Sequence, residues 1–271
     1  MGLILPFRSK NPLVFPATAP GINWAHPAAQ GFIRYSGVAL NGDFISLMNG
    51  SAGTVTASPT ALINSALGPA VKFSGTTDAV TVPVSTATDT TLTIGCIFVA
   101  NTSNSAGVLF TTDSQRGTNT IRLTLNSLGI EVNTNSAVDF PTGVSVTIGV
   151  PYFLAVTLIN DIVSSMPRFV LKRLDTGQVI TFPVSSPSAI IMAPSAGIAS
   201  IGTGVRSNLV SGASIAAVCW TTALLSTPQL LQWSNDPWSF WYPQKTDLAA
   251  MLKTPAAPSF TLPGYQPMVL M

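Results

Sequence analysis

Apolar and polar residues alternate along several segments of the chain, whereas a helical period is nearly absent. Within residues 91–100, 121–126 and 152–159, every second side chain is apolar. Alternation with a period of two, combined with many β-branched residues, indicates strands that bury one face. We therefore predict three half-buried strands, whose apolar faces consist of Leu92, Ile94, Cys96 and Phe98; Ile121, Leu123 and Leu125; and Tyr152, Leu154, Val156 and Leu158.

Shorter β-forming runs, separated by turn-forming Gly, Asn, Asp and Ser, indicate many further strands. A succession of short strands with closely spaced turns is typical of a β-sandwich or barrel. The one predicted helix follows Ser226, a suitable N-cap, begins at Thr227–Pro228 and ends near Trp233. The further strands are predicted at residues 70–73, 80–82, 108–112, 129–134, 144–148, 168–174, 179–182, 198–202 and 215–220.

The two ends of the chain differ from the middle because prolines interrupt them. Residues 1–30 contain five prolines and residues 244–271 contain four, so neither segment suits a central strand or a helix interior. Both also carry apolar and aromatic side chains that disordered tails usually lack. We predict extended N- and C-terminal arms at these positions, a sandwich at residues 31–226, and a short helix with an aromatic closing segment at residues 227–243.

The composition is poor in charge. Charged residues make up 8% of the chain and hydrophobic residues 46%, whereas an ordinary soluble protein has about 25% charged residues. Gly, Pro, Ser and Thr interrupt every uncharged run before it reaches the roughly 20 apolar residues of a membrane-spanning helix. The net charge is +2, and the basic residues form no stripe that would indicate nucleic-acid binding. We expect a soluble protein, made in the cytosol, whose surface is partly covered by partners.

Several motifs resemble those of LamG-like, concanavalin A-like jelly rolls. Residues 68–80 (GPAVKFSGTTDAV) resemble the entry strand of that family, and residues 151–158 (PYFLAVTL) resemble a later strand. Residues 199–202 (ASIG) and 216–226 (AAVCWTTALLS) are similar to its closing strands before a short helix. The resemblance implies an all-β fold, a two-sheet antiparallel jelly-roll sandwich with one short helix.

Two further motifs resemble proteins of this family that tailed bacteriophages encode. Residues 21–31 (GINWAHPAAQG) are similar to their lead-in, and residues 235–243 (NDPWSFWYP) to their closing signature, with Asp236 inserted and Trp241–Tyr242 in place of a simpler end. In all, the resemblance covers residues 21–243. It implies a virion or prophage setting, without indicating head, neck or tail.

Residues suited to catalysis are scarce. His26 is the only histidine and stands in the Pro-rich lead-in, where a packing or surface role is favoured over that of a general base. Glu131 is the only glutamate, so a pair of catalytic glutamates, as in several jelly-roll glycosidases, cannot form. An aspartate pair remains open, although most aspartates stand in turns. We predict no enzyme activity and no cofactor.

Few residues in the sequence indicate a metal site or a disulfide bond. Asp78, in a turn, is the position for calcium that we consider first, but no cluster of acidic residues accompanies it. We therefore predict no metal site. Cys96 and Cys219 are the only cysteines and both lie in apolar runs. Free, buried thiols are favoured, and a disulfide remains the alternative.

Aromatic residues are the candidates for contacts with partners. A dense block follows Pro237, and three interpretations of it stay open: packing on the chain's own sandwich, a protein-binding anchor, or a platform for sugar stacking. Trp220 and Trp233, which flank the helix, are expected to help close the core. The predicted protein-interface residues are Phe7, Phe15, Trp24, Trp238, Phe240, Trp241, Tyr242, Phe260 and Tyr265.

These features together favour a non-enzymatic structural protein of a bacteriophage particle. We expect a capsid decoration (cement) protein or a neck or tail accessory protein that binds major capsid, neck or tail proteins. It would be a homo-oligomer, a trimer being one possibility, and would have no nucleic-acid or membrane partner. The alternative is a receptor-binding or glycan-binding module of a phage tail.

Overall fold

The computed structural model describes most of the middle of the chain. The described residues are 20–40, 43–48, 54–56, 61–65, 67–73, 79–83, 91–100, 108–111, 121–124, 129–133, 137–141, 146–159, 161–165, 167–183, 188–190, 198–202 and 213–242. Both predicted arms therefore lie outside this part, except for residues 20–30.

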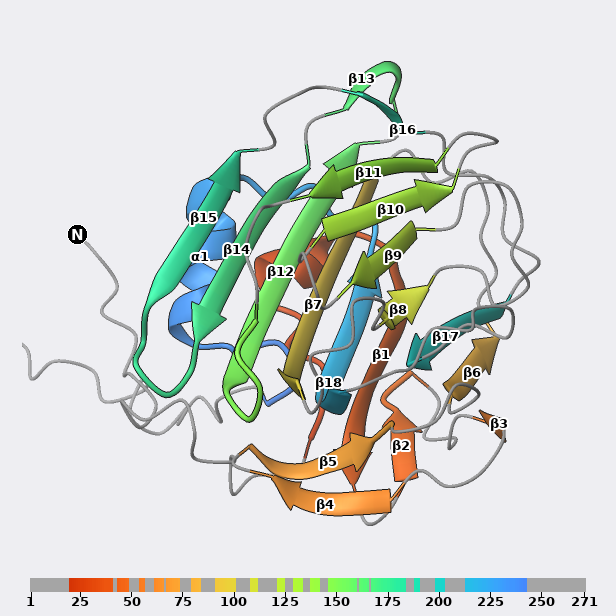
Figure 1. The fold of residues 1–271 in the computed structure, drawn as a ribbon, viewed down its shortest axis with the longest axis vertical. Coiled ribbons are helices and arrows are strands. Elements are labelled where there is room, and N and C mark those ends of the chain that lie inside the picture. Colours follow the sequence, from red (N-terminus) through yellow and green to blue (C-terminus); the bar gives the residue numbers. More distant parts are fainter. Residues whose placement is uncertain are drawn as a thin grey trace, which may run out of the picture.

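The larger of the two main sheets has nine strands, and all of its pairings are antiparallel (Figure 1). Seven strands follow one path across the sheet, and β5 and β4 extend it beside β18. In spatial order the path is β15 (Val179–Pro183), β14 (Arg168–Arg173), β12 (Pro151–Ile159), β7 (Thr91–Ala100), β18 (Ala213–Thr221), β1 (Ile33–Leu40) and β2 (Asp43–Ser46), with β5 (Gly68–Lys72) and β4 (Ala61–Ser65) beyond it.

A second sheet of seven antiparallel strands lies in front of the first in Figure 1. A small two-stranded sheet of β13 (Asp161–Ser165) and β16 (Ser188–Ile190) lies at one end of the molecule. In spatial order the second sheet contains β11 (Ala137–Pro141), β10 (Gly129–Asn133), β9 (Ile121–Thr124), β8 (Val108–Thr111), β17 (Ile198–Gly202), β6 (Ala79–Pro83) and β3 (Thr54–Thr56).

The space between the sheets holds the first part of the hydrophobic core, which we call the inner cluster. Val80, Leu109 and Ile201 of the smaller sheet contribute to it together with side chains from most strands of the larger sheet. Two antiparallel sheets that share one core form a β-sandwich. The prediction of an all-β jelly-roll sandwich is thus confirmed. From the larger sheet the inner cluster takes Tyr35, Ala39, Phe44, Leu92, Ile94, Cys96, Phe98, Tyr152, Leu154, Val156, Leu158, Phe169, Leu171, Ala213, Ile215, Val218 and Trp220, among others.

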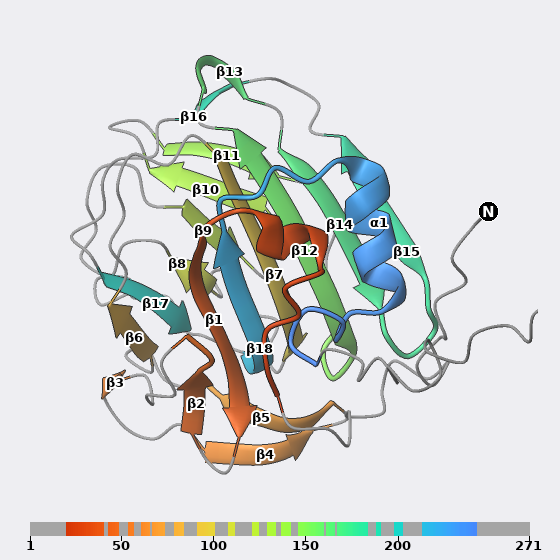
Figure 2. The same cartoon turned by 180° about the vertical axis from the view of Figure 1, so that it is seen from behind.

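The other face of the larger sheet is also covered, which the sequence analysis did not predict. The helix α1 (Thr227–Asn235) and the 3-10 helix η1 (Pro27–Gln30) lie on it (Figure 2). Beneath them lies an outer cluster of buried side chains, among them Ile97 and Phe153. The predicted apolar faces of β7 and β12 do point into the inner cluster, but the strands are not half-buried, because their second faces pack under these helices.

The two cysteines lie on opposite faces of this sheet. Cys96 belongs to the inner cluster, whereas Cys219 belongs to the outer one and stands opposite Gly95 on the neighbouring strand. Both thiols are buried and free, and burial raises the pKa of each. The interpretation as buried thiols is confirmed.

The helix α1 begins as predicted and extends two residues further. Ser226 is its N-cap, and its backbone N–H donates to Oε1 of Gln229 at 2.8 Å, as in a capping box. Pro228 in the first turn requires no hydrogen-bond partner for its nitrogen. The helix continues to Asn235. At its C-terminal end, the Asp236 N–H donates a hydrogen bond to the Trp233 carbonyl at 3.1 Å.

Other elements differ from the prediction. The strand predicted at residues 144–148 is wrong for its described part, because residues 146–150 form a loop. Gly149 adopts a positive φ of 75° and donates its N–H to the Ala100 carbonyl at 2.7 Å. Among the strands, the sequence analysis missed β1 because its run IRYSGVAL does not alternate. It also missed β2, β3, β4, β11, β13 and β16.

Candidate functional site

The segments that precede and follow the sandwich in the sequence meet on the outer face of its larger sheet. The entry segment, residues 20–32, and the closing segment, residues 236–242, are joined by backbone hydrogen bonds: the Gly21 N–H donates to the Trp241 carbonyl at 2.7 Å, and the Asn23 N–H to the Phe240 carbonyl at 2.9 Å. Nδ2 of Asn23 also donates to the Ser239 carbonyl at 2.9 Å. We call this pair of segments the clasp.

The clasp corrects the predicted boundary of the N-terminal arm. Residues 20–30 were assigned to an extended arm, but they are bound to the closing segment and contribute buried Ala28 and Ala29 to the outer cluster. They therefore form part of the domain. Pro20 and Tyr242, the described residues next to segments 1–19 and 243–271, lie close together, because their neighbours Gly21 and Trp241 are hydrogen-bonded partners.

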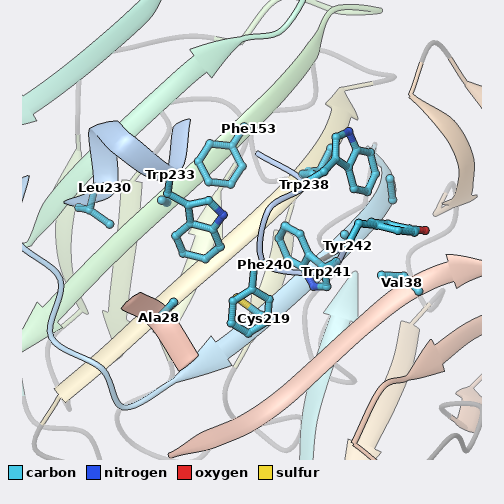
Figure 3. Close-up of a cluster of buried hydrophobic side chains, with 14 of the residues drawn as sticks. Ala28, Val38, Phe153, Cys219, Leu230, Trp233, Trp238, Phe240, Trp241 and Tyr242 are labelled. Atoms are coloured by element: carbon cyan, nitrogen blue, oxygen red, sulfur yellow. The ribbon is translucent and has the colours of Figure 1, made fainter. Parts of the chain in front are cut away.

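Aromatic rings fill the space between the clasp, α1 and the larger sheet (Figure 3). The centroid of the Trp233 ring lies 5.3 Å from that of Phe153, 5.7 Å from that of Phe240 and 5.9 Å from that of Trp241. Trp238 makes edge contacts with Trp241 and Tyr242. Such offset and edge-to-face pairs are the favoured arrangements of aromatic side chains.

These contacts overturn part of the interface prediction. Trp238 is 2% exposed, and Phe240, Trp241 and Tyr242 are 0% exposed. None of the four can contact a partner while the domain is closed, so their assignment as interface residues is wrong. The interpretation that the block packs on its own sandwich is the correct one, because the uncovered face of β7, β12 and β18 needs an apolar lid. Trp220 and Trp233 are also buried, as expected.

Two glycines allow the clasp to lie this close to the sheet. A Cβ added at Gly95 of β7 would lie 2.3 Å from the Trp233 ring, so only glycine leaves room for the indole. A Cβ added at Gly31 would lie 2.3 Å from the backbone nitrogen of Ala223. Both positions therefore require glycine for close approach and not for an unusual φ.

His26 lies inside the clasp and is 7% exposed. Nδ1 accepts a hydrogen bond from the Ala28 N–H at 3.1 Å, which makes the imidazole the N-cap of η1. The ring makes edge contacts with Trp233 and Phe240, with centroid distances of 4.7 Å and 5.5 Å. Burial lowers its pKa from 6.5 to about 4, so the ring is neutral at pH 7. This is the packing role that the sequence favoured over that of a general base.

One residue of the clasp faces solvent. Trp24 is 63% exposed, and its position is fixed from both sides: Oδ1 of Asn23 accepts the Ala25 N–H at 3.2 Å, and Nε2 of Gln30 donates to the Trp24 carbonyl at 2.8 Å. Exposed indoles on well-held backbone are typical of binding anchors. Among the described residues of the interface prediction, Trp24 is the one that the structure leaves exposed.

A second exposed aromatic residue was not among the predicted interface residues. Phe32 is 64% exposed at the end of the entry segment, and the Arg34 guanidinium lies over its ring at 4.5 Å. Its backbone is held by Thr222, whose Oγ1 accepts the Phe32 N–H at 2.9 Å. The one signal in the sequence was a lone Phe after Gly31 with an arginine two positions later, which is too common to single out.

The remaining candidates lie outside the described residues: Phe7, Phe15, Phe260 and Tyr265 of the arms, and Asp78. Within the described ranges, no three His, Cys, Asp or Glu side chains come together as a metal site would require. No helix in those ranges is long and apolar enough to cross a membrane.

Comparisons with known proteins give a fold and no family. No family model matches the chain, and neither does any curated protein. Among solved structures, domain 4 of the arabinanase AbnA from Geobacillus stearothermophilus, determined with arabinotriose, matches with a TM-score of 0.58 at 12% identity, over 75% of this chain and 98% of that one. This chain has the β-sandwich fold of that domain.

Other matches are to parts of larger proteins. The receptor-binding domain of botulinum neurotoxin type G matches with a TM-score of 0.51 at 9% identity, over 75% of this chain and 51% of that one. Trypanosoma rangeli sialidase matches with a TM-score of 0.50 at 13% identity, over 82% of this chain and 36% of the sialidase chain. This chain thus spans about half and about a third of those two structures.

Proposed function

We propose that this chain is a non-enzymatic structural protein of a bacteriophage particle, a capsid decoration or neck or tail accessory protein that packs against other virion proteins. The observation that carries the proposal is the clasp. The two motifs that resemble phage-encoded proteins, residues 21–31 and 235–243, form the two halves of the clasp and bind each other. The contact between the two motifs supports the interpretation that they belong together as one structural unit.

The clasp also supports the way in which such a protein would bind. The two Pro-rich flanking segments join the domain at Pro20 and Tyr242, next to the hydrogen-bonded pair Gly21 and Trp241, and the exposed Trp24 follows three residues after Gly21. A binding surface there would combine an aromatic anchor with two apolar segments in one place. The 29 residues of segment 243–271 could reach about 90 Å if fully extended, far enough to contact neighbouring subunits.

We expect Trp24→Ala to weaken binding of the protein to particles that lack it by about 30-fold, the loss of a hot spot worth about 2 kcal/mol. Binding is measured by cosedimentation of purified protein with such particles. The matched control is Ile148→Ala, which removes a 52% exposed side chain from the loop before β12. Equal binding by the wild type and both variants, or an undiminished particle in the absence of the gene product, contradicts the proposal.

The alternative is a glycan-binding module. It is favoured by the likeness to a domain that was determined with arabinotriose and by the exposed indole of Trp24, since aromatic faces stack on sugars. In this case we expect the purified chain to bind host surface polysaccharide in calorimetry, and Trp24→Ala to abolish the heat signal. Phe32→Ala is the comparison variant, since it removes a similarly exposed ring. If calorimetry detects no heat of binding with the polysaccharide at a millimolar concentration of its sugar units, glycan binding is excluded.

A further inference from the structure

His26 connects all the parts of the clasp. Its backbone N–H donates to the Asn23 carbonyl at 2.9 Å, and its own carbonyl accepts the Ala29 N–H at 2.8 Å. Its side chain caps η1 through Nδ1 and packs against Trp233 of α1 and Phe240 of the closing segment. A change in the charge of this one ring therefore acts on the entry segment, the helix and the closing segment at once.

Protonation would damage this arrangement in two ways. The imidazolium has no lone pair on Nδ1, so two N–H groups, those of Nδ1 and Ala28, would face each other at 3.1 Å. The charge would also lie in a buried, apolar enclosure. Attraction between a cation and aromatic faces gives about 0.5–2 kcal/mol. Burial opposes the charge more strongly than this attraction favours it, since burial lowers the pKa of His26 from 6.5 to about 4, which corresponds to about 3 kcal/mol.

No acidic group in the enclosing elements compensates the charge. Neither η1, α1, residues 237–242 nor strands β7, β12 and β18 contain a charged residue. The titratable group of β18 that belongs to the outer cluster is the Cys219 thiol, which burial keeps neutral. In the neighbouring elements, β14 carries Arg168, Lys172 and Arg173, β1 carries Arg34, and the Asp236 carboxylate after α1 interacts with Lys172.

We propose that His26 is a pH-sensitive latch, whose protonation releases the entry and closing segments from the outer face of the sheet and frees the point where both flanking segments attach. In the open clasp, His26 titrates near its ordinary pKa of 6.5 and in the closed clasp near 4. The closed clasp is therefore most stable relative to the open clasp above pH 6.5, and this stability decreases as the pH falls toward 4. Between pH 7 and pH 4 the closing equilibrium constant falls by about 100-fold.

Hydrogen exchange of the full chain tests the latch. The amides of Gly21 and Asn23 report on the clasp, and the amide of Leu154 in β12 reports on the sheet. After correction for intrinsic exchange rates, we expect protection of the first two to fall about 100-fold between pH 7 and pH 4, with Leu154 unchanged. Since the chain has one histidine, its imidazole proton resonance also gives the pKa directly by NMR.

The matched variant is His26→Asn, which keeps an N-cap acceptor but does not titrate between pH 4 and pH 7. We expect its clasp protection to be independent of pH. The latch is contradicted by a His26 resonance that titrates near 6.5, by clasp protection that stays constant in the wild type, or by the same pH profile in His26→Asn. Simultaneous loss of protection at Leu154 would indicate global unfolding and would also contradict it. If His26→Asn does not fold, the NMR titration of the wild type decides.

Discussion

Trp233→Ala is expected to lower the free energy of unfolding by about 3–5 kcal/mol, the largest effect of a single truncation in this domain. Trp233 is 1% exposed and its ring contacts Phe153, Phe240, Trp241 and His26. Its removal leaves a cavity under α1 that cannot close, because the clasp is hydrogen-bonded on its other side. Urea unfolding followed by far-UV circular dichroism measures the change.

Trp24→Ala serves as the control for Trp233→Ala, because it deletes the same side chain from a 63% exposed position. We expect it to cost less than about 1 kcal/mol. Trp233→Phe is expected to cost less than Trp233→Ala, since it keeps part of the ring volume and removes Nε1–H, a buried donor for which the described residues provide no acceptor. Equal losses for Trp24→Ala and Trp233→Ala would show that the outer cluster is not a folded core.

Gly31→Ala is expected to destabilise the domain by about 3 kcal/mol or more. The new Cβ would lie 2.3 Å from the backbone nitrogen and 2.7 Å from the Cα of Ala223. Because these are main-chain atoms of the connection between β18 and α1, the strain cannot be relieved by turning a side chain. Thermal unfolding measures the effect, and we expect the midpoint to fall by several degrees.

Gly21→Ala provides the comparison for Gly31→Ala within the same entry segment. A Cβ at Gly21 meets no atom within 4 Å, and alanine keeps the N–H that binds Trp241. We expect its midpoint to stay within about 1–2 °C of the wild type. A similar loss for both glycines would contradict close approach as the reason why Gly31 must be glycine.

Period-two alternation was enough to predict the face that β7 and β12 turn toward the second sheet. It could not predict that their other faces are buried as well, because Thr93, Gly95 and Thr157 on those faces read as polar or neutral positions. The structure shows why such residues stand there. Gly95 makes room for Trp233, and the hydroxyls of Thr93 and Thr157 bind each other at 2.6 Å.

The clasp depends on contacts that no local pattern contains. Asn23 and Ser239 are 216 positions apart, and the entry segment looks like a Pro-rich arm until the closing segment lies beside it. The aromatic block after Pro237 could not be interpreted from sequence for a similar reason. Composition alone does not distinguish aromatic residues that cover a sheet from aromatic residues that bind a partner. Among the described residues of the interface prediction, Trp24, held by Asn23 and Gln30, is the one that keeps the exposure expected of an anchor.

Because both faces of the larger sheet are buried, the sheet also keeps the two cysteine thiols of the chain apart. Cys96 and Cys219 stand on adjacent strands, but one thiol points to each side, so the sheet itself insulates one from the other. No intramolecular cross-link can form without turning a central strand over. The domain should therefore reach the same folded state under reducing and under oxidising conditions.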